Sequence, residues 1–140
     1  MSATNTFEQN ILKLILQNVD ITDLARGAAS AGNLYVSLHS ADPGETGTQQ
    51  TSEANYTSYG RVAVNRDTTD WSVSANGVNK VAITFPQATG GTTTATHFGI
   101  GTTSVGAGVL ILSGTLSATL AVSNGITPSF AINQLIVTAD

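Results

Sequence analysis

The sequence predicts a mainly β fold, an antiparallel sandwich or jelly-roll-like barrel of about eight short strands preceded by one N-terminal α-helix. Three observations lead to this prediction. From residue 33 onward, apolar and polar residues alternate in short segments. Glycine, proline and asparagine turn signals separate these segments. The stretch 81–139 contains no Asp, Glu, Lys or Arg and is polar mainly through side chains that form hydrogen bonds without the cost of desolvating an ion.

The first element is a helix. Asn5 and Thr6 are suitable N-caps, and Glu8 and Gln9 follow three residues later, as in a capping box. A stripe of apolar residues falls on one face at helical spacing and should end between residues 17 and 19. The stripe consists of Phe7, Ile11, Leu14 and Ile15, widened by Leu12 and Leu16. So apolar a helix must pack on its own sheet or on another subunit, and we interpret 1–27 as an N-terminal helical docking arm followed by a small-residue linker.

Residues 33–140 are predicted to form one β-sandwich domain. The alternation of Leu34, Val36 and Leu38 marks its first strand, and the turn 42–44 ends it. Residues 45–58 form a long polar loop. The other strands are expected at 59–64, 71–74, 81–85, 94–100, 109–112, 116–122, 126–130 and 134–138. Since 109–112 is apolar on both faces, we expect it to be a central strand.

The composition excludes several classes of partner. Only 10% of the 140 residues are charged, and the net charge is −4. The five basic residues are scattered and form no stripe, so we expect no nucleic-acid partner. No apolar run is long enough to span a bilayer, and the N-terminus lacks the basic start of a signal peptide, so we expect no membrane association and synthesis in a cytoplasm. The absence of Cys removes disulfides and thiolate chemistry.

No catalytic residue, cofactor or metal site is predicted, and we do not expect an enzyme. The weak metal candidates are His39, Asp42 and Glu45, a mixed imidazole and carboxylate set at a strand end and turn. A capped turn with a solvent-facing histidine is the favoured interpretation of those three residues. His97 has no acid near it in sequence to orient it as a base, and we expect a packed or interface histidine. The glycine pairs at 99–101 and 106–108 lack the lysine of a phosphate loop and are read as turns.

The low charge instead favours assembly. A charge-poor β surface risks association along its sheet edges unless other subunits cover it; a very stable extracellular β structure is the other explanation. We therefore expect a homotrimer or another homo-oligomer. The candidate interface residues are the helix stripe and two aromatic residues beside the polar loop: Phe7, Ile11, Leu14, Ile15, Tyr56 and Tyr59. The two tyrosines could also flank a core formed by Trp71, which is the simpler interpretation.

Several blocks of the sequence resemble small structural proteins of tailed bacteriophages. These blocks are residues 34–47, 59–64, 83–86, 96–101 and 126–130. Such proteins are often labelled phage tail fibre proteins, and similar small β-rich proteins decorate capsids. The resemblance implies a virion component made in the host cytoplasm and no enzymatic activity. Our leading hypothesis is a capsid decoration (cement) subunit that binds the major capsid shell and stabilises the head. The alternative is a tail or tail-fibre component that contacts other tail proteins or the host surface, with residues 45–58 as its contact tip.

Overall fold

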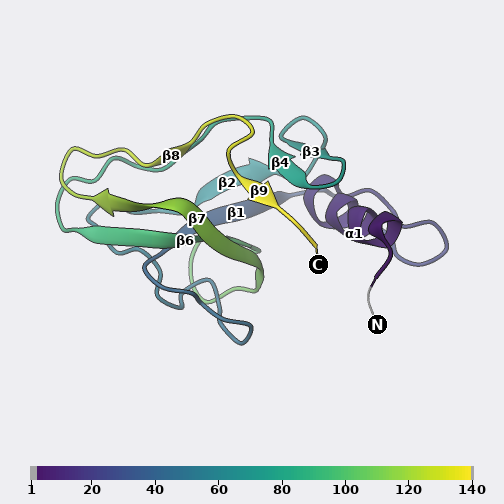
Figure 1. Ribbon diagram of the computed structural model, residues 1–140, viewed down its shortest axis with the longest axis horizontal. Coiled ribbons are helices and arrows are strands. Elements are labelled where there is room, and N and C mark those ends of the chain that lie inside the picture. The colour runs from purple at the N-terminus through teal and green to yellow at the C-terminus, as the bar shows by residue number, and fades with distance from the viewer. Residues whose placement is uncertain (1–2, 140) are drawn as a thin grey trace. The chain divides into compact units, whose positions relative to one another are not determined.

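The computed structural model describes residues 3–139 and confirms the prediction of a mainly β protein with one helix (Figure 1). Within that range, nine strands form three sheets. The elements are α1 (Asn5–Gln17), β1 (Asn33–His39), β2 (Val62–Asn65), β3 (Trp71–Val73), β4 (Gly77–Asn79), β5 (Ile83–Thr84), β6 (Thr93–Gly101), β7 (Leu110–Val122), β8 (Ser129–Phe130) and β9 (Ile136–Val137). The sheets have the orders β2-β1-β6-β7, β3-β4-β9 and β5-β8. The strand pairs β1–β6, β6–β7, β3–β4 and β4–β9 are antiparallel.

The chain forms two compact units. The first contains the described parts of 1–33, 65–83 and 130–140, and the second contains 34–64 and 84–129. The helix thus groups with β3, β4 and β9, although residues of the second unit separate it from these strands along the sequence. The division into a docking arm at 1–27 and a β domain at 33–140 stays a prediction.

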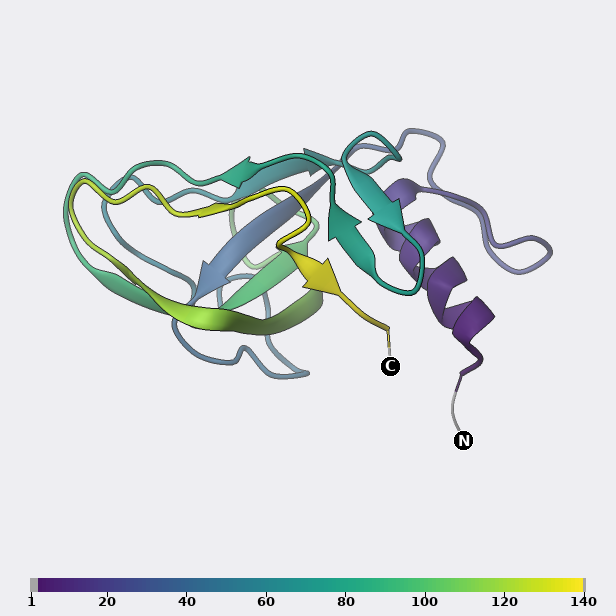
Figure 2. The same cartoon turned by 45° about the horizontal axis from the view of Figure 1, so that its top comes forward.

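The helix of the first unit begins one residue earlier than its predicted caps. Thr4 is the N-cap, and its Oγ1 accepts a hydrogen bond of 3.3 Å from the Phe7 amide. Asn18 ends the helix in the left-handed conformation, within the predicted range, and its side chain ties residue 28 to the helix end. The helix contacts β3 and β4 (Figure 2). The buried residues of the helix are Leu12 and Leu16, which were expected only to widen the apolar stripe.

Close packing in the first unit explains a strand that sequence reasoning missed. We expected no strand between the segments 71–74 and 81–85, but Gly77 begins β4 there and is buried. A Cβ at this position would collide with the side chains of Leu16 and Val137. Glycine is therefore needed here for close approach of the helix and β9 to the strand. Trp71, on the neighbouring β3, is fully buried, as expected for a core tryptophan.

The second unit is built on the four-stranded sheet. In the β1–β6 pair, Tyr35 lies opposite Gly101 and His39 opposite His97. Buried apolar side chains of both strands supply the core, among them Val36, Leu38 and Ile100. Beside this sheet, the Phe85 amide donates to the Pro128 carbonyl at 2.9 Å, and the Phe85 ring stacks on Tyr59 with centroids 6.3 Å apart.

The prediction for residues 109–122 is wrong in two respects. We expected two strands, the first of them central, but Leu110–Val122 is a single strand at the edge of the sheet. Only Val122 of these residues is buried, and Leu110, Ile111 and Leu112 are half-buried. An apolar pattern on both faces therefore does not report burial within this chain, because the strand has a neighbour on one side alone.

Candidate functional site

The densest polar cluster lies in the second unit, where the end of β1 meets the loop that follows it. His39 is fully buried. Its Nδ1 lies 2.8 Å from the Thr51 carbonyl oxygen, and its Nε2 lies 2.8 Å from Ser37 Oγ. A carbonyl only accepts, so Nδ1 carries the proton and Nε2 accepts from the Ser37 hydroxyl. Burial lowers the pKa of His39 more than the Thr51 carbonyl raises it. The imidazole is thus a neutral connector that holds the loop.

A buried ion pair holds the same loop further along. Arg61 Nε donates to Glu53 Oε1 at 2.7 Å, and Arg61 Nη2 donates to Oε2 at 2.8 Å. The Arg61 side chain is 2% exposed. Its remaining donors reach the carbonyl oxygens of Thr103 at 2.9 Å and Gly106 at 2.7 Å. The hydrogen bond to Glu53 raises the pKa of Arg61. The guanidinium thus joins three segments of the chain through bidentate geometry.

Tyr59 and Gln49 complete the network. The Tyr59 hydroxyl donates to Glu53 Oε1 at 2.9 Å, and burial raises the pKa of this phenol. Gln49 is fully buried, and its Oε1 accepts from the Thr103 amide at 3.0 Å. A Cβ on Gly101 or Gly108 would collide with the Gln49 side chain. These glycines leave room for a buried amide. The expectation that 99–101 forms a turn is wrong, because these residues end strand β6, whereas 106–108 lie in the turn between β6 and β7.

The three weak metal candidates occupy different environments. His39 has protein partners on both ring nitrogens, whereas Asp42 and Glu45 are exposed. Asp42 Oδ1 accepts from the Gly44 amide at 2.9 Å, which caps the turn as expected. The prediction of a solvent-facing histidine is wrong, because His39 is fully buried and both of its ring nitrogens face protein atoms. Among residues 3–139, no group of three or more His, Cys, Asp or Glu side chains is placed to hold a metal ion.

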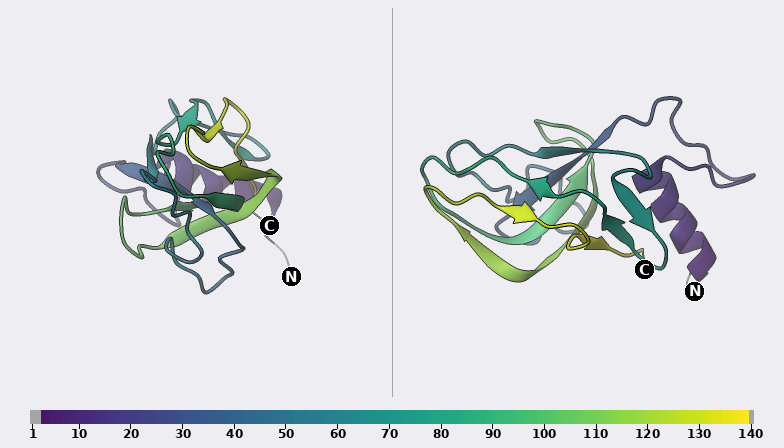
Figure 3. Two further views of the ribbon diagram at one scale, coloured as in Figure 1. Left: turned by 90° about the vertical axis from the view of Figure 1, so that its left-hand side faces the viewer. Right: turned by 90° about the horizontal axis from the view of Figure 1, so that it is seen from above.

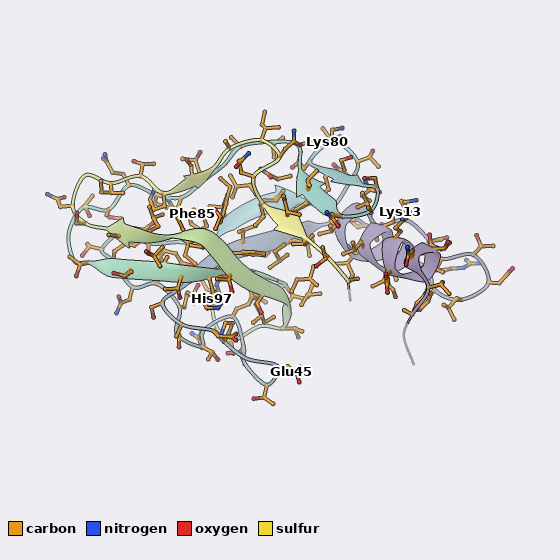
Figure 4. All side chains as sticks on the ribbon, viewed as in Figure 1. Lys13, Glu45, Lys80, Phe85 and His97 are labelled. Carbon is orange, nitrogen blue, oxygen red and sulfur yellow. The ribbon has the colours of Figure 1, made fainter. Side chains whose placement is uncertain are left out.

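Asp42 and Glu45 instead share a surface depression with the other histidine. The depression has a volume of about 340 Å³ and is lined also by His97 and residues 113–115 of β7. His97 Nδ1 lies 2.8 Å from Thr96 Oγ1, and Nε2 lies 3.3 Å from Thr115 Oγ1. Figure 4 labels His97 on β6 and Glu45 on the neighbouring loop. With both ring nitrogens of His97 facing hydroxyl groups, this arrangement contains no base and nucleophile aligned by an acid.

The predicted interface residues fall into two groups. Of the helix stripe, Phe7 is 39% exposed, whereas Ile11, Leu14 and Ile15 are partly buried. The tyrosines point into the second unit: Tyr56 is 2% exposed and donates to the Pro86 carbonyl at 2.9 Å, and the rings of Tyr56 and Tyr59 pack edge to face. The role of all six in an interface stays a prediction, and the helix stripe offers more free surface than the tyrosines.

Sequence reasoning missed the most open apolar surface of the second unit. Val105 is 78% exposed and Val109 is 62% exposed, both in the turn between β6 and β7. The half-buried leucines of β7 follow directly. The sequence marks part of this surface as the uncharged apolar run 109–112, but we predicted that run to be a central strand.

No helix in residues 3–139 has the length and apolar character required to cross a membrane.

Comparison with known families gives one match. The family model described as Podophage GP4 fiber I protein gp80 matches residues 2–138, which is nearly the whole chain. No curated protein shows significant similarity to the chain. The family match supports a phage structural protein of the tail-fibre type, in agreement with the resemblance noted in the sequence, and it does not confirm capsid decoration.

Proposed function

We propose that this chain is a structural component of a phage tail fibre, because it belongs to the podophage GP4 fiber I protein gp80 family. The single observation that carries the proposal is the family match, which covers residues 2–138 of the 140. The family description names a fibre protein, so it favours the alternative hypothesis of the sequence analysis over the cement hypothesis.

The proposal includes a non-catalytic role. Support comes from the polar residues of the second unit, whose hydrogen bonds are directed at other parts of the chain. The buried imidazole of His39 and the Glu53–Arg61 pair are saturated by protein partners, which suits rigid loops better than turnover. Buried, fully satisfied polar networks of this kind fix one conformation of the segments that they join.

The partners would be other virion proteins and further copies of the chain. Loop 45–58 was expected to be a contact tip with aromatic side chains. Tyr56 is buried, however, and the Tyr59 hydroxyl donates a hydrogen bond to Glu53. We propose instead that contacts use the exposed aliphatic residues of the turn between β6 and β7, Val105 and Val109. Exposed apolar patches on a small protein mark interaction surfaces.

Localisation on the particle tests the proposal. Gold-labelled antibodies against the purified chain should decorate the tail of intact virions. Particles that lack the chain serve as the control for background. Labelling spread over the head, with binding of the chain to empty heads and none to isolated tails, would overturn the fibre assignment and support the cement hypothesis.

A further inference from the structure

Strand β7 leaves one side of the four-stranded sheet open. The strand spans Leu110–Val122, and within the described chain β6 is its only strand partner. Figure 3 shows β7 running along β6 at the outer margin of this sheet. An edge strand directs unpaired N–H and C=O groups outward, and another strand can pair with them. β7 is therefore a template for strand addition.

Three of the usual protections of an edge, namely shortness, charge and proline, are missing from β7. Natural proteins shorten their edge strands or place Lys or Pro on them. The thirteen residues of β7 contain no charge and no proline. Four leucines, at positions 110, 112, 116 and 120, remain only partly buried, while hydroxyl side chains at 113, 115, 117 and 119 are exposed. The strand thus has an alternating pattern, but its apolar face is incompletely covered.

The middle of β7 also lacks partners in β6. The pairing steps from Ala95 opposite Leu120 to His97 opposite Thr115, so residues 116–119 have no opposite residue. Such an irregularity can serve to turn an edge away from neighbours. Here it also leaves four consecutive residues of β7 without a paired residue in β6. The outward backbone groups of these residues need a partner in protein or water.

The sequence of β7 is complementary to itself when reversed. In an antiparallel pair of identical strands related by a two-fold axis at Leu116, residues equally far before and after position 116 lie opposite each other. Hydroxyl residues then meet hydroxyl residues, small residues meet small residues, and the aliphatic residues 110–112 meet the apolar residues 120–122. The central pairs are Thr115–Ser117, Gly114–Ala118 and Ser113–Thr119.

We propose that two copies of this chain pair through β7, antiparallel and about a two-fold axis at Leu116. The pairing continues the sheet across the interface, with four strands from each copy. The partner is a second copy and not another protein, because the match of residue types about position 116 is a property of the strand with itself. This inference does not depend on where in the virion the chain resides.

Cysteine cross-linking tests both the pairing and its register, since the native chain has no Cys. Opposite residues of an antiparallel pair lie within the Cα separation that a disulfide requires. Leu116→Cys faces its own copy and should give a dimer band under oxidising, non-reducing conditions. Ser113→Cys and Thr119→Cys lie opposite each other, so each alone would be separated from its copy by six residues along the strand, or roughly 20 Å.

The expected pattern is a dimer band for Leu116→Cys and for the equimolar mixture of Ser113→Cys and Thr119→Cys. Each of the last two alone should cross-link at least about tenfold less, as the separation of its copies dictates. Positions 113 and 119 are exposed, so these variants keep the fold even if the leucine variant does not. A native chain that sediments as a monomer at every concentration, or equal cross-linking of all three single variants, would overturn the proposal.

Discussion

The two edges of the four-stranded sheet are built in opposite ways. Strand β2 forms one edge with four residues, Val62–Asn65, and arginines stand on either side of it at positions 61 and 66. Strand β7 forms the other edge with thirteen residues and no charge. A short edge with flanking charges resists pairing with other chains, whereas a long uncharged edge permits it.

The difference shows how this chain uses its few charges. On the side of β2, Arg61 is buried in contacts with Glu53 and with the carbonyl groups of the turn between β6 and β7. Charge there stabilises the fold of one copy. The stretch 81–139, which contains β6 and β7, has none, and its surface is suited to being covered. The four predictions that follow test this contrast, beginning with the largest expected effect.

Removal of the Arg61 guanidinium should strongly destabilise the chain. Arg61→Ala removes the cation from Glu53, which keeps only the Tyr59 hydroxyl as a donor, and it leaves the Thr103 and Gly106 carbonyl groups without the guanidinium. Breaking a buried pair in this way costs about 3–5 kcal/mol. Chemical denaturation followed by tryptophan fluorescence measures the change. Arg26→Ala is the matched control, since Arg26 is exposed and its removal should change the free energy of unfolding by no more than about 0.5 kcal/mol. Equal effects of the two variants would refute the structural role of the charge beside β2.

A lysine on β7 should weaken self-association without affecting the fold. Ser117→Lys brings two like charges close to the two-fold axis, and we expect at least about a tenfold rise in the dimer dissociation constant, or about 1.4 kcal/mol. Sedimentation velocity measures this constant. Ala63→Lys, at an exposed position of the opposite edge, should leave it unchanged. If the two lysines act alike, the contrast between the edges has no bearing on assembly.

Acid should destabilise the second unit at the loop 45–58, which His39 holds through the Thr51 carbonyl. Burial lowers the pKa of His39 from its usual 6.5, so the unfolded chain binds a proton more readily than the folded chain. The contribution is fully present above pH 6.5 and is lost as the pH falls below it towards the folded pKa. Glu53, Arg61 and His97 are the charged or titratable groups that act on this imidazole.

Thermal unfolding of the native chain should therefore shift to lower temperature between pH 7.5 and pH 5.5, a range set by the ordinary histidine pKa of about 6.5. His39→Asn should be less stable at neutral pH but should show a shallower decline over the same range. An identical pH profile in both proteins would mean that another group governs the loss.

The smallest effect is expected at the exposed end of the helix. Phe7→Ser removes a side chain that is 39% exposed, and the free energy of unfolding should change by less than about 1 kcal/mol. Dimerisation should not change either, because β7 and not α1 carries the self-association. A loss of dimer comparable to that of Ser117→Lys would show that the helix stripe is the self-association surface. Leu16→Ala is the informative companion, since Leu16 is fully buried and its truncation should cost about 2–5 kcal/mol.

Local patterns in the sequence were sufficient for the fold class and for the helix. Periodicity marked α1 to within one residue at each end, and alternation marked β1 and β6, because both signals depend on residues a few positions apart. The contacts of Gln49 with Gly101 and Thr103 join residues more than fifty positions apart, and no local pattern reports them. Arg61 and Thr103, which are 42 positions apart, are likewise joined by a hydrogen bond that no local pattern reports.

The error at β7 has a different physical cause. An apolar strand pattern reports that side chains are suited to burial, but not which chain buries them. In the single chain, Leu112 and Leu116 are half-buried at an edge. A central strand needs a neighbouring strand on both sides. Residues 110–112 have such a neighbour on one side only in the sheet of one copy, so the interpretation of 109–112 as central is wrong for the single chain.

Hydrogen exchange of the native chain tests most directly the claim that the β7 edge is covered by a second copy. Exchange would be followed for peptides spanning β7 and β2, at concentrations from the monomeric to the fully associated range. The account predicts that amides of residues 110–122 become at least about tenfold more protected on association, with residues 115–118 among them, while β2 exchanges at one rate throughout. Exchange of β7 that is independent of concentration would contradict it.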